Sequence, residues 1–271
     1  MKNQIKLLVL DIDGTILKKN FTFSTRLKKT IRKAQQKRVR VALTTGRMFY
    51  TSLPFAKKLK ITEPISCYQG ALIKSINGKN IYHHPLSISV SNQILKLAQK
   101  NNWSCNFYID DKLYMTKATT KEAKKYLKIE TQFHNNYFEI NLDNFKIAKK
   151  PTKIIIIEKM GNIKKVEVEL KKLLGNKIET TYGVAEFLDI MKKGTNKGTA
   201  LKELAKTLKV SLKDTMVIGD FYNDISMFEV AGLSVAVKNA PKKVQSYVDF
   251  VTDSCENDGA AKAIEKYILE K

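Results

Sequence analysis

Residues 5–15 read IKLLVLDIDGT, an apolar stretch that ends on two aspartates, a glycine and a threonine. An apolar run of this length predicts a strand that is buried on both faces, as in a parallel sheet. Asp11 and Asp13 follow this strand directly, and in open α/β sheets functional sites form at the carboxyl ends of the strands. This stretch therefore predicts both the fold class and the place of the site.

Strands and helices alternate on both sides of this stretch. A helix is predicted from Thr25 to Lys37 with Ser24 as its N-cap, followed by a strand over 39–44, a helix over 47–59 and a strand over 65–68. This alternation is typical of a parallel sheet with right-handed crossovers. It returns after Gly194, with strands predicted over 215–218, 233–237 and 250–252 between helices over 197–208, 224–231, 241–247 and 259–269.

The middle of the chain has a different pattern. Helices are predicted over 91–101 and 163–174, strands over 153–157 and 186–191, and a hairpin over 106–115 that turns at Asp110-Asp111. Such a mixture favours a separate α+β unit with an antiparallel sheet. We therefore predict an α/β fold: a Rossmann-like parallel-sheet core, residues 1–82 plus 190–271, interrupted by an inserted α+β domain, residues 83–189.

The composition and the first residues indicate the cellular compartment of the protein. No apolar stretch reaches eighteen residues, and the first apolar run leads into aspartates instead of a cleavage site. The three cysteines have neither metal-site nor disulfide spacing. We expect a cytoplasmic protein with no membrane contact.

The charge balance raises a second hypothesis, nucleic-acid binding. Lys and Arg number 49 against 26 Asp and Glu, a formal net charge of +23. The lysines are spread along the whole chain, however, and are not interleaved with aromatic residues that could stack on bases. We therefore do not expect a nucleic-acid partner, although a positive field would attract phosphorylated anions.

The two aspartates of the opening stretch would repel each other. Two carboxylates about 4 Å apart repel by about 4 kcal/mol at an effective dielectric constant of 20. Such a pair needs a shared proton or a cation, and Mg²⁺ prefers oxygen ligands of this kind. A solvated acidic turn is the alternative for a lone Asp-x-Asp, but the full DIDGT at a strand end favours a metal site.

Two further motifs suit an anion. Thr44-Thr45-Gly46-Arg47 ends the second strand, where the Thr45 hydroxyl and the Gly46 amide could hold a phosphate; Thr45 as a simple helix cap is the alternative. Lys197 lies in Asn196-Lys197-Gly198, at a predicted helix start where the helix dipole disfavours a cation. That lysine is therefore either solvated or held opposite an anion.

A second acidic cluster, Gly219-Asp220-Phe221-Tyr222-Asn223-Asp224, follows the strand over 215–218. Asp220 could supply another metal carboxylate, Asn223 could donate to a phosphate oxygen, and Asp224 could orient its neighbours. A loop capped by Asn223 or Asp224 is the alternative. The four motifs together, each at a strand end or helix start, favour one shared site.

DIDGT at 11–15, TTGR at 44–47, NKG at 196–198 and GDFYND at 219–224 resemble the four motifs of the haloacid dehalogenase-like hydrolases, in their Cof-type branch. Residues 107–114, 185–193 and 257–259 also resemble Cof-type segments, so that the likeness covers nearly the whole chain. One departure is visible: Gln69-Gly70 stands where Cof-type proteins usually carry Asn-Gly, which weakens any substrate contact inferred from that position.

The resemblance implies a Mg²⁺-dependent phosphatase that works through an aspartyl phosphate. It implies Asp11 as the nucleophile and Asp13 as the general acid and base, and Mg²⁺ bound by Asp11, Asp220 and the backbone carbonyl of Asp13. It also implies a phosphate-binding set of Thr45, Gly46, Lys197 and Asn223. The inserted domain would be the cap that selects a small phosphate monoester, such as a sugar phosphate, pyridoxal phosphate or flavin mononucleotide.

Three alternatives remain at this point. A phosphotransferase or phosphomutase of the same superfamily would use the same core residues. A basic nucleic-acid-binding protein with a degenerate core is disfavoured because all four motifs are intact. A nicotinamide-dependent dehydrogenase is disfavoured because no G-x-G-x-x-G follows the first strand.

Overall fold

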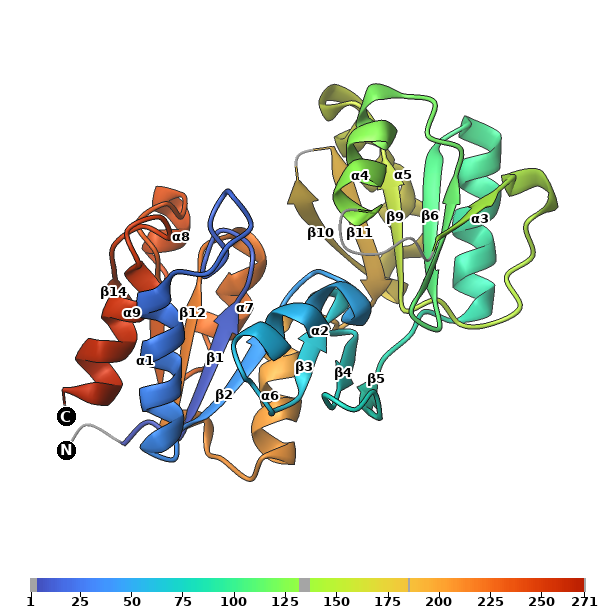
Figure 1. Ribbon diagram of the computed structural model, residues 1–271. Helices are drawn as coiled ribbons and strands as arrows, with labels where there is room; N and C mark the ends of the chain where they lie inside the picture. The colour runs from blue at the N-terminus through green and yellow to red at the C-terminus, as the bar shows by residue number, and fades with distance from the viewer. Residues whose placement is uncertain (1–3, 132–136, 185, 271) are drawn as a thin grey trace. The chain divides into compact units, whose positions relative to one another are not determined.

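The computed structural model describes residues 4–131, 137–184 and 186–270 (Figure 1). The chain forms two compact units, one of residues 1–47, 52–82 and 196–271 and one of residues 48–51 and 83–195. The predicted division after residue 189 differs from this arrangement. Strand β11 (Phe187–Lys192) runs through that point and pairs with β9 (Lys153–Ile157), so the second unit extends to Thr195. Residues 1–3 and 271, which we assigned to the core, and residues 132–136 and 185, which we assigned to the inserted domain, lie outside the described residues.

The first unit is built on an eight-stranded sheet in the order β14-β13-β12-β1-β2-β3-β4-β5. The strands from β14 to β3 run parallel, and β4 returns antiparallel to β3. This confirms the predicted parallel sheet. The bounds are β1 (Leu7–Asp11), β2 (Arg40–Thr44), β3 (Ile65–Cys67), β4 (Leu72–Lys74), β5 (Asn80–His83), β12 (Thr215–Gly219), β13 (Leu233–Ala236) and β14 (Phe250–Val251).

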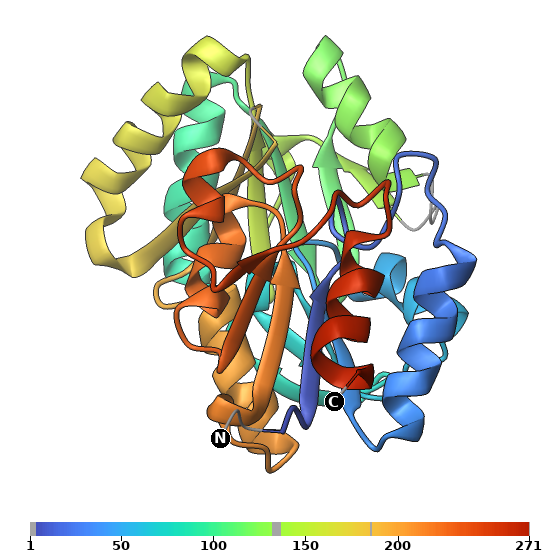
Figure 2. The ribbon, with the colours of Figure 1, turned by 90° about the vertical axis from the view of Figure 1, so that its left-hand side faces the viewer.

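Helices cover both faces of this sheet. Helix α1 packs against α9 and β2, whereas α6 packs against α7 and the strands β3 and β4; Figure 2 shows α1 and α9 on one side of the sheet and α6 on the other. The predicted cap of α1 is confirmed, because the Leu27 amide donates to Ser24 Oγ at 3.0 Å. The bounds are α1 (Thr25–Gln36), α6 (Lys197–Thr207), α7 (Ile225–Phe228), α8 (Lys242–Gln245), α9 (Gly259–Ile264), and α2 (Phe49–Lys58), whose first turn groups with the second unit.

Strand β1 is buried on both faces, as its unbroken apolar pattern predicts. Leu7 and Val9 share a core with Leu201 of α6. Because successive side chains of a strand point to opposite faces, Leu8 and Leu10 face the other helix layer, and they are buried as well. The strand that carries Asp11 therefore lies at the centre of the unit and is held rigidly from both sides.

The second unit contains a six-stranded sheet in the order β10-β11-β9-β6-β7-β8, in which β7 and β8 (Tyr137–Ile140) run parallel and the other pairs antiparallel. Helices α3 (Ile88–Asn101) and α5 (Met160–Leu174) share one core with Trp103. The predicted hairpin is confirmed as β6 (Ser104–Ile109) and β7 (Lys112–Thr116). Asp110 and Asp111 both have positive φ, as a type I′ turn requires.

Three elements of the second unit were not predicted: α4 (Lys121–Thr131), β8 and β10 (Ile178–Val184). Helix α4 buries Ala123 and Tyr126 within a run of lysines, and β8 exposes Phe138 and Glu139. Their hydrophobic periodicity is therefore too weak to be recognised without the neighbouring strands.

Within residues 4–131, 137–184 and 186–270, none of the helices combines the length and the apolarity that crossing a membrane would require. The three cysteines, Cys67, Cys105 and Cys255, are buried and are not joined in disulfides.

A buried ion pair joins β9 to β11 and leads to a stability prediction. Lys153 Nζ lies 3.3 Å from Asp189 Oδ1, and each side chain is only 5% exposed. Removing Asp189 takes a carboxylate away from a lysine that is buried in a medium of low polarity. We expect Asp189→Ala to lower the free energy of unfolding by about 3–5 kcal/mol, measured by urea denaturation.

The matched control is Lys149→Ala, which removes the ion pair of Lys149 with Asp110 and leaves the turn residue Asp110 in place; the side chains of this pair are 68% and 57% exposed. Water screens this pair, so we expect a much smaller loss than for Asp189→Ala. Equal losses in the free energy of unfolding for the two variants would show that the buried pair contributes no more to stability than the exposed pair.

Candidate active site

The carboxyl ends of three neighbouring strands bring the predicted site residues to one edge of the first unit. In the register of β1 and β2, Asp11 lies opposite Thr44, and in that of β1 and β12, Leu10 lies opposite Ile218. Asp220 follows β12 by one residue. Because parallel strands end at the same edge, residues more than 170 positions apart in the chain converge there.

Three carboxyl groups meet at this edge. Asp11, Asp220 and Asp224 each offer a carboxylate oxygen, and these oxygens all lie within 4.8 Å of one another. Asp11 and Asp224 are buried and Asp220 is partly buried. The structure thus brings together the acidic residues of two separate motifs.

Lys197 lies between two of these carboxylates. Its Nζ donates to Asp11 Oδ1 at 2.5 Å and to Asp224 Oδ1 at 2.5 Å, and the residue is only 2% exposed. The solvated lysine that the sequence left open is therefore excluded. Lys197 is the first residue of α6, where the helix dipole disfavours a cation, and the two carboxylates offset that cost.

Asp224 holds the loop after β12 in place. Its Oδ2 accepts hydrogen bonds from the backbone amides of Asp220 and Phe221, both at 2.9 Å, while its Oδ1 accepts from Lys197. A Cβ at position 219 would lie 2.6 Å from the Asp224 carboxyl carbon, so only Gly219 permits this close approach. Both carboxylate oxygens of Asp224 are engaged, which suits an orienting role better than metal ligation.

Thr15, to which the sequence analysis gave no role, connects two of the carboxyl groups. Its hydroxyl lies 2.8 Å from Asp220 Oδ1 and 3.3 Å from Asp11 Oδ2. A hydroxyl has only one proton, so the shorter contact to Asp220 is the stronger bond. Gly14 has a φ of 74°, and a Cβ there would lie 2.3 Å from Asp220 Oδ2. The signal available in the sequence was the DIDGT motif itself, of which Gly14 and Thr15 are part.

Asp13 is engaged in a different contact from the other acids. Arg47 Nε and its second guanidinium nitrogen Nη2 donate to the two carboxylate oxygens of Asp13 at 2.6 Å each. The Asp13 side chain is 48% exposed. Arg47 therefore forms an ion pair with Asp13, a contact that could not be predicted from the TTGR motif alone.

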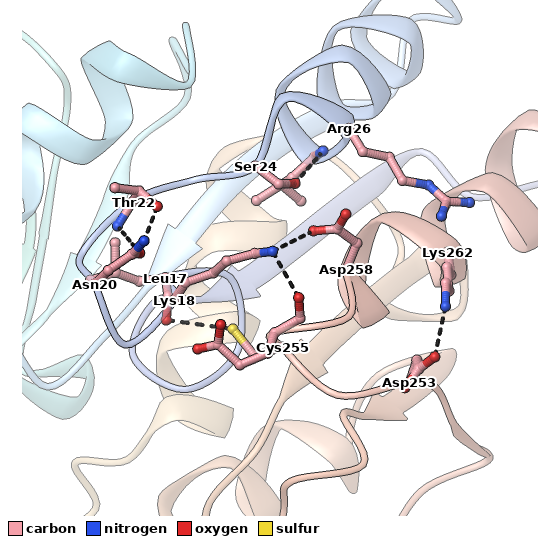
Figure 3. A network of polar contacts seen from close by, with 12 residues as sticks. Leu17, Lys18, Asn20, Thr22, Ser24, Arg26, Asp253, Cys255, Asp258 and Lys262 are labelled. Carbon is pink, nitrogen blue, oxygen red and sulfur yellow. Dashed lines mark hydrogen bonds and ion pairs between the residues drawn. The ribbon is translucent and has the colours of Figure 1, made fainter.

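A network of polar contacts fixes the loop that follows Thr15 (Figure 3). Lys18 Nζ donates to the Glu256 carbonyl at 2.7 Å and lies 3.3 Å from Asp258 Oδ1, and the Cys255 thiol donates to the Leu17 carbonyl at 3.4 Å. Closer to the acids, Asn239 Nδ2 donates to the Gly14 carbonyl at 2.9 Å. The segment that carries Asp13 and Thr15 is thus tied to the 253–259 loop.

The remaining predicted phosphate-binding residues lie in the turns after β2 and β12. Thr45 Oγ1 accepts from the Arg47 amide at 3.2 Å, a local turn contact of the capping kind, although α2 starts later, at Phe49. Asn223 Nδ2 donates to Gln69 Oε1 at 2.9 Å. Asn223 Oδ1 is buried and has no hydrogen-bond partner within the described part of the chain.

The crowding of charges shifts the pKa values of the cluster. Burial raises the pKa of Asp11 well above its ordinary value; Lys197 opposes this, and Asp224 and Asp220 add to it. Burial and repulsion from Asp224 raise the pKa of Asp220 to about 7, against the hydrogen bond from Thr15 and the charge of Lys197. Burial lowers the pKa of Lys197, but attraction to Asp11 and Asp224 outweighs burial and raises it overall.

These residues fit a divalent cation. Three carboxylates against one ammonium leave two negative charges in excess when all are ionised. Repulsion between the carboxylates adds to burial, the largest cause, in raising the pKa values of Asp11 and Asp220. A doubly charged ion would balance the excess negative charge, and oxygen donors are those that Mg²⁺ prefers.

Comparison with known proteins identifies the family. The family model of the haloacid dehalogenase-like hydrolases matches residues 8–264. The 5-amino-6-(5-phospho-D-ribitylamino)uracil phosphatase YcsE of Bacillus subtilis is 27% identical over 272 residues, which span 98% of this chain and 96% of the relative. Phosphatase YwpJ of the same organism is 24% identical and spans 98% of this chain and all of that protein.

Solved structures show the same fold. A haloacid dehalogenase-like hydrolase from Bacteroides thetaiotaomicron has a TM-score of 0.86 at 27% identity, covering 97% of this chain and 99% of that one. Protein TM0651 from Thermotoga maritima has a TM-score of 0.85 at 27% identity and covers 97% of each chain. With its α/β core and inserted second unit, this chain belongs to the haloacid dehalogenase-like hydrolase family and is an enzyme of the phosphatase class.

Proposed function

We propose that this chain is a Mg²⁺-dependent phosphatase that hydrolyses small phosphate monoesters through an aspartyl phosphate on Asp11. The observation that carries this proposal is the buried bridge of Lys197 between Asp11 and Asp224, with Asp220 beside it. A solvated acidic turn would need no buried lysine. A nucleophilic carboxylate that must approach a phosphate dianion needs positive charge next to it.

In the first step, a carboxylate oxygen of Asp11 attacks phosphorus in line with the ester oxygen, which leaves as an alkoxide. Lys197 uses two of its three N–H donors on Asp11 and Asp224, and the third remains for a phosphoryl oxygen. Thr45, Gly46 and Asn223 would hold the other phosphoryl oxygens. Charge stabilisation of this kind counts most where negative charge develops in the transition state.

Asp13 would move the proton in both steps. It gives a proton to the leaving alkoxide, and in the second step it takes one from the water that attacks the aspartyl phosphate. The bond between phosphorus and the Asp11 oxygen then breaks and releases inorganic phosphate. Because Arg47 holds both oxygens of Asp13, that ion pair has to open before Asp13 can carry the proton.

We assign the metal ligands to the carboxylates of Asp11 and Asp220 and to the backbone carbonyl of Asp13. When bound, Mg²⁺ would neutralise the excess negative charge and polarise a phosphoryl oxygen. Thr15 donates a hydrogen bond to one oxygen of Asp220, and Asp224 accepts hydrogen bonds from the backbone amides of Asp220 and Phe221. These contacts, which hold Asp220 in place, support its assignment as a ligand.

The relatives and the second unit support the proposed substrate class. YcsE is named for a phosphorylated ribitylaminouracil, a small phosphate monoester, which supports an ester of that size here. We propose that the second unit, residues 48–51 and 83–195, acts as the cap that selects the ester. Cysteines that form no disulfide also suit a reducing cytoplasm, where we place the enzyme.

A phosphate-release screen tests the proposal. The full chain would be incubated with sugar phosphates, pyridoxal phosphate, flavin mononucleotide and ribitylaminouracil phosphate, with Mg²⁺ or with EDTA. We expect release of inorganic phosphate from at least one ester, only with Mg²⁺. An isomerised ester without free phosphate would instead identify a mutase, and salt-dependent nucleic-acid binding without turnover would contradict the proposal.

Asp11→Asn tests the nucleophile. The amide keeps the shape of the side chain but cannot form the acyl phosphate, so we expect kcat to fall at least about a thousandfold. Circular dichroism should show an unchanged fold. Asp214→Asn, which removes an exposed ion pair with Lys6, is the matched control and should keep full activity. A near-normal kcat in Asp11→Asn would exclude Asp11 as the nucleophile.

Asp13→Ala tests the proton transfer. Loss of a general acid and base typically costs about 10²- to 10⁴-fold in rate. The second step, which needs a base, should slow more than the first for esters with good leaving groups, because those need no proton. We expect intact-protein mass spectrometry after acid quenching to show a phosphorylated chain. Full turnover by this variant would remove Asp13 from the mechanism.

The pKa of Asp220 predicts how Mg²⁺ binding depends on pH. It is raised from 3.8 to about 7, so the folded metal-free protein holds this proton more tightly than the unfolded chain does. This group therefore makes the metal-free fold less stable as pH rises from about 4 to 7. Below about pH 7, Mg²⁺ must displace the proton, which weakens its binding.

We accordingly expect Mg²⁺ to raise the Tm more at about pH 8 than at about pH 6, with up to about tenfold tighter apparent binding at the higher pH. Differential scanning fluorimetry with EDTA-treated protein measures both quantities. Asp220→Asn should abolish the Mg²⁺ effect at either pH. Equal Mg²⁺ stabilisation of the native sequence at the two values would contradict the assignment of Asp220 as a ligand.

A further inference from the structure

The turn after β3 has an unusual backbone. Tyr68, Gln69 and Gly70 have φ values of 53°, 58° and 100°, so two non-glycine residues in succession adopt the left-handed region. Glutamine is not among the residues that enter this region readily. Hydrogen bonds hold the turn: the Gln69 amide donates to the Thr45 carbonyl at 3.0 Å, and the Tyr68 amide donates to the Arg47 carbonyl at 2.9 Å. Such strain persists where the surrounding structure imposes it, often beside a functional site.

This conformation places the Gln69 side chain between two turns of the predicted phosphate site. Gln69 is buried, and its Oε1 accepts a hydrogen bond from Asn223 Nδ2 at 2.9 Å. A Cβ at Gly46 would lie 2.3 Å from Gln69 Nε2, so the carboxamide packs directly against that glycine. Because β1 lies between β2 and β12 in the sheet, Gln69 connects the turns on either side of the strand that carries Asp11.

Asn223 is left with unused hydrogen-bonding capacity. A carboxamide has two N–H donors and an acceptor oxygen, and one donor is given to Gln69. Its Oδ1 is buried with no partner in the residues that the structure describes, an arrangement that costs stability. The hydrogen bond to Gln69 explains this orientation, because it fixes the Asn223 carboxamide even though Oδ1 is then left unsatisfied.

We propose that Gln69 is a positioning residue of the phosphate site. Its Oε1 orients the Asn223 carboxamide so that the second N–H stays available for a phosphoryl oxygen, and its contact with Gly46 keeps the turn after β2 at a fixed separation from the turn after β12. This inference rests on the proposed function, because it assumes that Asn223 and Gly46 bind phosphate. It also gives the Gln-Gly at 69–70 a role within the core unit.

The proposal requires that positions 69 and 223 be energetically coupled. Gln69→Met keeps the length of the side chain and removes its hydrogen-bonding groups. If Gln69 acts through Asn223, its loss matters only while Asn223 is present. A double-mutant cycle measures this coupling directly.

The experiment compares the native sequence, Gln69→Met, Asn223→Ala and the double variant, with inorganic phosphate as a competitive inhibitor and an ester from the phosphate-release screen as substrate. We expect Gln69→Met to raise the Ki of phosphate and the KM roughly three- to tenfold, as loss of one neutral hydrogen bond would, with a smaller change in kcat. The double variant should match Asn223→Ala within about twofold. Gln35→Met, which removes a surface hydrogen bond to the Lys60 carbonyl, is the control and should leave the Ki unchanged.

Additive effects of the two substitutions, or an unchanged phosphate Ki in Gln69→Met, would overturn the proposal. If Gln69→Met fails to fold, Gln69→Asn replaces it, because asparagine accepts the left-handed backbone but is one methylene too short to keep the Asn223 contact. It should raise the phosphate Ki in the same way, and native-like affinity would refute the positioning role. A native enzyme that neither binds phosphate nor hydrolyses any ester would instead overturn the proposed function itself.

Discussion

The ion pair that Lys197 forms with Asp11 and Asp224 is the constraint on which the rest of the site depends. An ammonium and two carboxylates are held where water does not reach, and each would be costly to bury alone. Mutual attraction lowers that cost but leaves Asp220 as a further negative group. The cluster therefore has an excess of negative charge when its carboxyl groups are ionised. A bound cation would balance that excess, and a site that transfers phosphate needs positive charge at this place.

The parallel sheet makes this arrangement possible. Strands β1, β2 and β12 end at one edge, and their neighbouring loops bring residues from the start and the end of the chain together. Gly14 and Gly219 permit the backbone to approach the carboxyl groups more closely than any side chain would allow. The Gln69–Asn223 hydrogen bond adds a link across the same edge. The buried strands and the hydrogen-bonded loops at their carboxyl ends hold the site residues in place. This gives the preorganisation that electrostatic catalysis requires.

Much of this organisation could be predicted from local sequence patterns. The buried strand β1, the Ser24 cap and the Asp110-Asp111 turn each depend on a few adjacent residues, and the structure agrees with all three. The contacts of Thr15 with Asp220, of Arg47 with Asp13 and of Gln69 with Asn223 could not be predicted in this way. They join residues that are distant in sequence, and each residue alone carries only a turn or surface pattern. The polar helix α4 and the strands β8 and β10 were missed because they bury few side chains or alternate weakly.

A crystallographic experiment tests the shared metal site of Asp11 and Asp220 most directly. Crystals of the full chain would be soaked in Mn²⁺, which takes the same kind of oxygen ligands as Mg²⁺ and scatters anomalously. We expect an anomalous peak about 2.1 Å from carboxylate oxygens of both Asp11 and Asp220, with the Lys197 ammonium still bound to Asp11. A fully occupied peak elsewhere, or no peak while Asp11 and Asp220 turn away from each other, would contradict the shared metal site.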